Sequence, residues 1–166
     1  MVFSKAIIRK MQLIDIVSKF KEALSDEVVS KIIKDAKSSE IKKHHISILM
    51  CSDSGKLLSM GRNWLTLGSE TKYSVHSEVD CINRFYYKKT LPSCRKTMLN
   101  IRLSKKIQKV GNSKPCTHCR NFIVHHKNTL NLDKVIYTTG DELVTVISED
   151  LELMETKLST GDRPRD

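Results

Sequence analysis

The sequence predicts an α/β protein in which one mixed, five-stranded sheet is packed by helices. Three observations lead to this fold class. Helical and strand-like patterns alternate along the chain, beginning with two helices and then two strands. The 166 residues are 39% hydrophobic, which is enough for one core without disulfide staples. The last two strands are separated only by residues 139–142, and so short a connection requires an antiparallel pair.

Two helices are expected at the N-terminal end. Apolar residues recur at helical spacing from Ile7 to Phe20, which predicts a helix over residues 4–24. Residues 25–27 then provide a cap and an acidic first turn for a second helix, which is expected to end near Ser38.

A hairpin and a helix follow. Residues 46–51 and 56–61 have the composition of strands, and residues 52–55 between them supply turn chemistry. A loop over residues 63–74 is expected to lead into a helix that runs from about His76 to about Lys88.

The second half of the chain predicts a strand, a basic loop, a helix, the final hairpin and a closing helix. The strand is placed at residues 96–103 and the basic loop at 104–114. The helix begins at Cys116 and Cys119 and continues through Phe122–Val124. The final hairpin joins strands at 134–138 and 143–147, and Ser148–Asp150 cap a closing helix that continues through Met154.

One domain over residues 1–166 accounts for this pattern, with a core at about 26–153, the N-terminal helix at 4–24 and a frayed tail at 159–166. No stretch has the eighteen or so apolar residues that a membrane span needs. The N-terminal residues also lack the pattern of a signal peptide. We therefore expect a cytoplasmic protein with no membrane partner.

The five cysteines form an odd set without regular spacing, which argues against a disulfide framework. Cys51 and Cys81 stand in apolar surroundings and are expected to be packing residues, and Cys94 is expected in a loop. Four histidines have no useful ligand spacing and are expected at the surface: His44, His45, His125 and His126.

The net charge of +10 is distributed unevenly. Residues 81–132 contain twelve Lys or Arg and no Asp or Glu, and this basic stretch includes a pair of cysteines. It predicts either contact with a negatively charged substrate or nucleic acid, or a solvated basic face. Composition alone favours the solvated face.

Two short motifs indicate the chemistry of the chain. His76 stands two residues before Glu78, and Pro115 precedes Cys116 and Cys119. H-x-E followed by P-C-x-x-C is the pattern of zinc-dependent nucleobase deaminases. His76 and Glu78 are about 200° apart around a helix, so they can serve one site only from a first helical turn. The two cysteines lie on one side of a helix that Pro115 is suited to begin.

These spacings predict that the N-terminal ends of two helices meet at one zinc ion. His76, Cys116 and Cys119 supply three protein ligands and leave a fourth position for water, as in catalytic zinc sites. Bound zinc lowers the pKa of water to roughly 7. Glu78 is then expected to take the released proton and deliver it to the substrate.

Two interpretations without catalysis stay open. In a structural zinc site the cysteines pair with His125 or His126, although the five or six residues between differ from the roughly twelve of a zinc finger. In an inactive module the zinc ion stabilises a nucleic-acid-binding domain. Glu78 argues against this second interpretation because a purely structural site has no use for it.

Over residues 26–153 the chain resembles the cytidine deaminase superfamily, and the resemblance rests on the two motifs. It implies the three-layer cytidine deaminase-like fold, in which both motif helices lie beneath a central sheet. It also implies that His76, Cys116 and Cys119 are the zinc ligands and that Glu78 is the proton shuttle.

Three residues are candidates for binding the substrate: Asn63, Ser77 and Pro115. Gly61-Arg62-Asn63 resembles the G-x-N step that ends the second strand of the superfamily, whose asparagine contacts the sugar. From sequence alone Asn63 fits a turn residue equally well. Ser77 stands where the superfamily usually has an alanine whose backbone touches the base, and Pro115 opens the cysteine motif.

The final hairpin and the Cys119-Arg120 pair resemble the enzymes that deaminate free nucleosides. Leu65, however, occupies the place where those enzymes tend to have an acid for the ribose. The first hypothesis is therefore hydrolysis of cytidine or deoxycytidine to the uridine-type product, with release of ammonia and with a pyrimidine nucleoside or nucleotide as partner.

The alternative hypothesis is the same reaction on deoxycytidylate or on RNA or DNA. Phosphates would then be held by basic residues of the second half of the chain: Arg95, Lys96, Lys105, Lys106 and Lys109. The resemblance also implies a homo-oligomer, either a dimer or a tetramer.

Overall fold

The computed structural model describes residues 24–38, 43–66, 74–104, 110–140 and 142–157. The helix expected over residues 4–24 lies almost wholly outside the described residues, as does the tail expected at 159–166. Lys105, Lys106 and Lys109 are outside them too.

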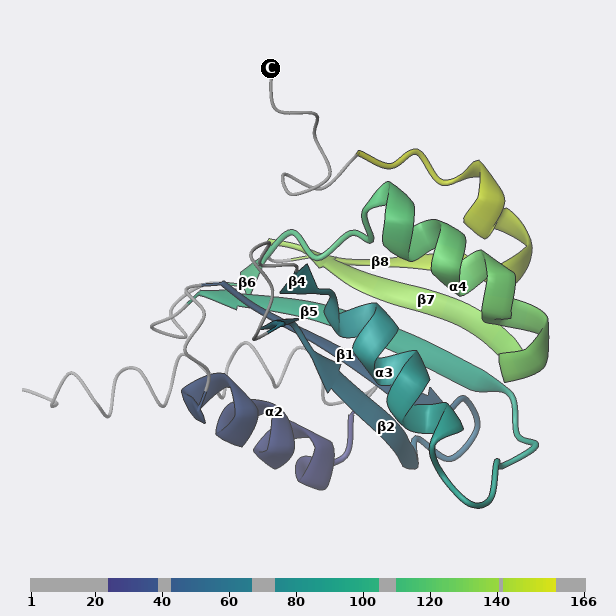
Figure 1. The fold of residues 1–166 in the computed structure, drawn as a ribbon, viewed down its shortest axis with the longest axis horizontal. Coiled ribbons are helices and arrows are strands. Elements are labelled where there is room, and N and C mark those ends of the chain that lie inside the picture. The colour runs from purple at the N-terminus through teal and green to yellow at the C-terminus, as the bar shows by residue number, and fades with distance from the viewer. Residues whose placement is uncertain (1–23, 39–42, 67–73, 105–109, 141, 158–166) are drawn as a thin grey trace, which may run out of the picture.

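The predicted mixed sheet is confirmed, and its five main strands run in the spatial order β2-β1-β5-β7-β8 (Figure 1). Their bounds are β1 Lys43–Cys51, β2 Leu57–Arg62, β5 Lys96–Ser104, β7 Leu132–Thr139 and β8 Glu142–Ile147. β5 and β7 are parallel, and the other pairs along this path are antiparallel. The last two strands are therefore antiparallel, as the short connection between them requires.

Helices cover both faces of this sheet, which makes three layers (Figure 1). Helix α2 (Asp26–Ser38) packs Val28 and Ile32 on one face. Helices α3 (Ser77–Tyr86) and α4 (Thr117–Leu130) cover the other face and contact each other. Successive side chains of a strand point to opposite faces of the sheet. Leu99 of β5 therefore packs with α2, whereas its neighbour Met98 packs with α3 and α4.

Helix α4 is the crossover between the parallel strands β5 and β7. Parallel neighbours need a connection long enough to return to the same end of the sheet, and a helix meets that need. The helix ends at Asn131, whose φ of 52° is left-handed and turns the chain into β7. Because of this path, the N-terminal turn of α4 lies near the end of β5, beside α3.

Several predicted boundaries were wrong. β1 begins at Lys43, so His44 lies inside the strand and is 3% exposed, and His45 is half-buried rather than at the surface. The loop expected over 63–74 contains the paired strands β3 (Trp64–Leu65) and β4 (Ser74–Val75). These pairings join segments that are separated in sequence, which local patterns do not reveal.

Two further elements also differ from expectation. The loop expected over 104–114 contains a short strand, β6 (Val110–Gly111), that pairs with the end of β5. The closing helix is the short 3-10 helix η1 (Ser148–Leu153), in which Leu151 is buried. Short helical pieces often take the tighter 3-10 form because one or two turns gain few α-type hydrogen bonds.

Cys51 and Cys94 form a disulfide, with Cα atoms 5.9 Å apart. Cys51 does pack in the core and Cys94 does lie in a loop, but the odd cysteine count did not predict that the two are bonded to each other. The bond joins the end of β1 to the segment before β5, and these are adjacent because β1 and β5 pair along their whole length. Cys81 is a buried free thiol, as expected. Among the described helices, none is both long and apolar enough to cross a membrane.

Candidate metal centre

The structure brings His76, Cys116 and Cys119 together, as the two motifs predicted. Their ligand atoms all lie within 4.8 Å of one another. His76 Nδ1 is 3.1 Å from the Sγ atom of Cys119 and 3.5 Å from that of Cys116. Within the described ranges, this is the one group of three or more such side chains close enough to share an ion.

Two helix N-termini meet at this group. His76 is the N-cap of α3 and has extended backbone angles, with φ −78° and ψ 153°. Cys116 is the N-cap of α4, and its Sγ accepts the backbone N–H of Cys119 at 3.5 Å. Pro115 lies one residue before this cap instead of at the first helical position. Both helix dipoles direct their positive ends at the thiols, which favours thiolate.

Helix α3 is seated unusually close to strand β2. A Cβ atom placed on Gly61 would lie 2.2 Å from the backbone nitrogen of Cys81 and 2.3 Å from the carbonyl oxygen of Ser77. Only glycine permits this approach. The contact is supplemented by Ser59, whose hydroxyl donates to the Cys81 carbonyl at 2.9 Å. The glycine of the G-x-N step thus sets the depth at which the first turn of α3 enters the molecule.

A second set of contacts fixes the first turn of α3 laterally. The Ser77 hydroxyl is 2.8 Å from that of Ser47 in β1 and donates to Glu78 Oε2 at 3.3 Å. Ser77 therefore connects the sheet to the carboxylate of Glu78 through its side chain. Its contact with a base stays a prediction.

Glu78 is buried beside the metal group, with 5% of its surface exposed. Its Oε2 atom is 3.5 Å from Cys119 Sγ. Burial raises the pKa of this carboxyl above its usual range, although hydrogen bonds and the nearby His76 oppose the rise. A group whose pKa is raised toward neutrality is suited to exchanging protons.

The two thiols shift each other's pKa in opposite directions. A hydrogen bond with Cys119 lowers the pKa of Cys116 to about 4. The same interaction, together with burial, raises the pKa of Cys119. The site therefore favours the thiolate form at Cys116, and both thiols must lose their protons to bind an ion.

The donor set fits a soft or borderline metal ion. One imidazole nitrogen and two sulfur atoms are typical ligands of zinc, whereas calcium and magnesium prefer oxygen. Neither His125 nor His126 belongs to the group. His126 Nδ1 instead lies 3.3 Å from the Tyr86 hydroxyl. This placement removes the interpretation in which the cysteines pair with one of these two histidines.

A cavity of about 470 Å³ adjoins the metal group. Cys116 and the buried Pro115 are part of its wall, and so is His45 of β1. Asn63 does not line the cavity but is bonded to His45, which does. The Asn63 side-chain Oδ1 accepts the His45 backbone N–H at 3.0 Å, and the Asn63 backbone N–H donates to the His45 carbonyl at 3.2 Å. These two bonds join the end of β2 to β1.

The sequence motifs did not point to Asp80. It is 7% exposed, and its carboxylate accepts the Arg62 backbone N–H at 3.1 Å, the Trp64 indole N–H at 3.3 Å and the Arg84 side chain at 2.7 Å. These bonds hold the Arg62 backbone on one side of Asn63 and the Trp64 side chain on the other. The four-residue spacing of Asp80 and Arg84 fits an ordinary helical ion pair, so the sequence carries no sign of this role.

Two basic residues proposed to hold phosphates are engaged elsewhere. Arg95 pairs with Asp53 at 3.1 Å and with Asp133 at 3.3 Å. Lys96 is 2% exposed and donates to the carbonyls of Pro92 and Cys94. Both lie at the opposite end of β5 from Ser104, away from the cavity beside the metal group. Any phosphate held by these two residues would thus lie away from that cavity, and phosphate binding by them stays a prediction.

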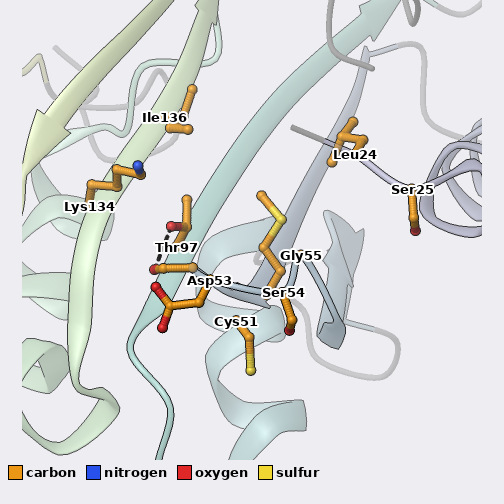
Figure 2. Close-up of a pocket in the computed structure, with 11 residues that line it drawn as sticks. Leu24, Ser25, Cys51, Asp53, Ser54, Gly55, Thr97, Lys134 and Ile136 are labelled. Atoms are coloured by element: carbon orange, nitrogen blue, oxygen red, sulfur yellow. Dashed lines mark hydrogen bonds between the residues drawn. The ribbon is translucent and has the colours of Figure 1, made fainter. Parts of the chain in front are cut away.

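A second cavity, of about 480 Å³, lies on the α2 side of the sheet (Figure 2). Its apolar lining includes Leu24, Met50 and Ile136, and its polar lining includes Asp53 and Lys134. A hydrogen bond of 2.9 Å between the hydroxyls of Ser52 and Thr97 crosses its wall. None of the three metal-group residues lines this cavity, so it is separate from the candidate metal centre.

No family model matches the chain, and comparisons with curated proteins and with solved structures find no match. The chemistry of the site must therefore be argued from its residues.

Proposed function

We propose that this protein is a zinc-dependent hydrolytic deaminase that converts a cytidine-type nucleoside to its uridine-type product and releases ammonia. The observation that carries the proposal is the position of Glu78. A buried carboxylate lies 3.5 Å from one member of a three-residue group that can hold a metal ion. Burying a carboxylate is costly, and a structural metal site gains nothing from it.

Zinc is the ion best suited to these residues. A catalytic zinc site has three protein ligands and one open position, and His76, Cys116 and Cys119 form such a set. The H-x-E and P-C-x-x-C spacings are those of zinc deaminases that act on nucleobases. The resemblance to the cytidine deaminase superfamily also implies both motif helices on one face of the sheet, which agrees with α3 and α4 here.

Glu78 would perform the proton transfers. When bound, zinc would supply a water molecule of lowered pKa as the nucleophile for C4 of the pyrimidine. Glu78 Oε2 would accept a proton from this water and deliver it to the ring nitrogen N3. It would then take the proton of the new C4 hydroxyl and pass it to the amine, so that the C4–N bond breaks as the carbonyl forms. The hydroxyl of Ser77 orients the carboxylate during these steps. Water enters, and the uracil-type product and ammonia leave.

A Glu78→Gln variant tests this function. We expect the purified native protein to contain about one zinc ion per chain. The variant keeps its metal but loses ammonia release from cytidine or deoxycytidine by about 10²- to 10⁴-fold, because the proton carrier is gone. Metal content is measured by atomic absorption and turnover by the fall in ultraviolet absorbance.

Glu149→Gln is the matched control, since Glu149 is an exposed acid of η1 outside the metal group. It should retain both metal and activity. Full activity of Glu78→Gln would overturn the proton route. A zinc-containing native protein that deaminates no cytosine compound, nucleoside or nucleotide, would instead support a structural site.

A further inference from the structure

The cavity beside the metal group has an unusual concentration of positive charge. Besides Pro115 and Cys116, its wall includes three cationic side chains from separate parts of the chain: Arg102 of β5, Lys114 of the loop before α4, and Lys157 of the C-terminal segment. Among the described residues of the wall, the one acid is Glu155. His45 and Asn112 add polar groups. The described part of the wall therefore carries a net positive charge without counting His45.

These three cations differ from other basic residues in their ion pairing. Over the described residues, none of the three forms an ion pair with a carboxylate. Arg95, just before the same strand, in contrast contacts two carboxylates. Among the described residues, the guanidinium of Arg102 makes one long hydrogen bond, of 3.4 Å, to the Asn112 carbonyl. Within this part of the chain, most of its five donors are left for another acceptor.

Contacts within the chain position the stem of Arg102 and the backbone of the two lysines around the cavity. The stem of Arg102 lies against Gly111 of β6, where an added Cβ would be 3.1 Å from Arg102 Cδ. The Asn112 side chain accepts the Lys114 backbone N–H at 2.9 Å. The carbonyl of Lys157 accepts the Thr117 backbone N–H at 3.1 Å, which fixes the C-terminal segment to the first turn of α4.

An unmatched polar group lies two residues from Arg102 on the same strand. Asn100 is 2% exposed, and neither atom of its amide has a hydrogen-bond partner among the described residues. Residues two apart on a strand face the same side, so Asn100 and Arg102 share the face of β5 that α3 and α4 cover. Asn100 is also paired in register with Ser47, which bonds to Ser77 at the metal group.

We propose that this cavity binds the phosphate of a pyrimidine mononucleotide, with Arg102 as the main contact and Lys114 and Lys157 beside it. The inference rests on the proposed deaminase function and names its substrate class. A guanidinium presents paired donors that match phosphate oxygens, and lysines add charge. The cavity volume of about 470 Å³ lies within the roughly 300–1,000 Å³ of small-molecule sites. Because Cys116 forms part of the wall, the phosphate would lie beside the base.

Binding to the Glu78→Gln protein tests the inference independently of turnover. Calorimetry compares cytidine with cytidine 5′-monophosphate and its deoxy form on the zinc-loaded protein. We expect tighter binding of the monophosphates. Adding Arg102→Gln should weaken their binding about 10- to 100-fold, as expected for loss of a charged hydrogen bond. Arg102→Lys should weaken it less, and Arg95→Gln, a remote paired arginine, should leave it unchanged.

Equal affinity for cytidine and its monophosphates, or no effect of Arg102→Gln, would overturn the inference. Much tighter binding of a single-stranded oligonucleotide, with a steep dependence on salt, would also overturn it in favour of a polymeric substrate. The failure of the deaminase function is a separate result: Arg102-dependent nucleotide binding without turnover by the native protein refutes the reaction and retains the phosphate site. Turnover of cytidine by the native protein without Arg102-dependent binding of the monophosphates would support the reaction and refute the phosphate site.

Discussion

Replacing Gly61 with alanine should displace the half of the site that α3 carries. The added Cβ would lie 2.2, 2.3 and 2.7 Å from three backbone atoms of Cys81 and Ser77. All three belong to the helix backbone, so no flexible side chain can move aside. Separating the closest pair to at least 3.0 Å requires a relative movement of about 0.8 Å between β2 and the first turn of α3.

This movement has an energetic and a functional consequence. Overpacking of a buried contact costs about 1–3 kcal/mol, and a backbone clash belongs at the upper end of that range. For a chain of this length, about 2–3 kcal/mol lowers the melting temperature by roughly 5–10 °C. The same displacement moves His76 and Glu78 away from Cys116 and Cys119. An error near 1 Å in a catalytic group can cost about 10²-fold in rate.

Thermal unfolding, zinc affinity and turnover measure these effects on one protein preparation. Ser59→Ala is the matched control, because it removes the hydrogen bond between β2 and Cys81 without adding volume. We expect it to cost about 1 kcal/mol and to leave zinc affinity nearly unchanged. Gly61→Ala with native stability and native zinc affinity would refute the steric argument.

Three other predictions follow from the described contacts. Zinc binding should release protons and become stronger as the pH rises, because cysteine thiols must be deprotonated to bind the ion; a calorimetric titration in buffers of different ionisation enthalpy that finds no proton release would contradict this. Asp80→Asn should shift the fluorescence of Trp64, the single tryptophan, to longer wavelength and cost about 1–3 kcal/mol of stability; an unchanged spectrum would count against the indole contact. Reducing the Cys51–Cys94 disulfide, which spans 43 residues, should cost up to about 4 kcal/mol in urea unfolding, and the double serine variant should no longer respond to reductant.

The metal group could be predicted because its information is local. His76 and Glu78 are two residues apart, and Cys116 and Cys119 are three apart, so each pair is positioned by a single helical turn. The one further requirement was that the two turns meet, and the motif pattern implied it. The antiparallel final hairpin was equally predictable, since its connection is too short for any other arrangement.

Arg102, Asn100 and Asp80 were not predictable in the same way. Each follows from strand register or from packing between segments far apart in the sequence. Arg102 reaches the cavity because β5 places it opposite His45, whereas Arg95, seven residues earlier, ends among acids at the other end of the strand. From composition both are simply members of a basic stretch.

The proposed reaction depends on local sequence, whereas the choice of substrate depends on tertiary packing. The type of reaction is indicated by short motifs, because metal ligands and a proton carrier need only the geometry of helix ends. Which molecule enters depends on the cavity that β1, β5, the loop before α4 and the C-terminal segment enclose together. Long-range packing alone brings those segments to one place, and so the cationic wall beside Cys116 became visible only in the folded chain.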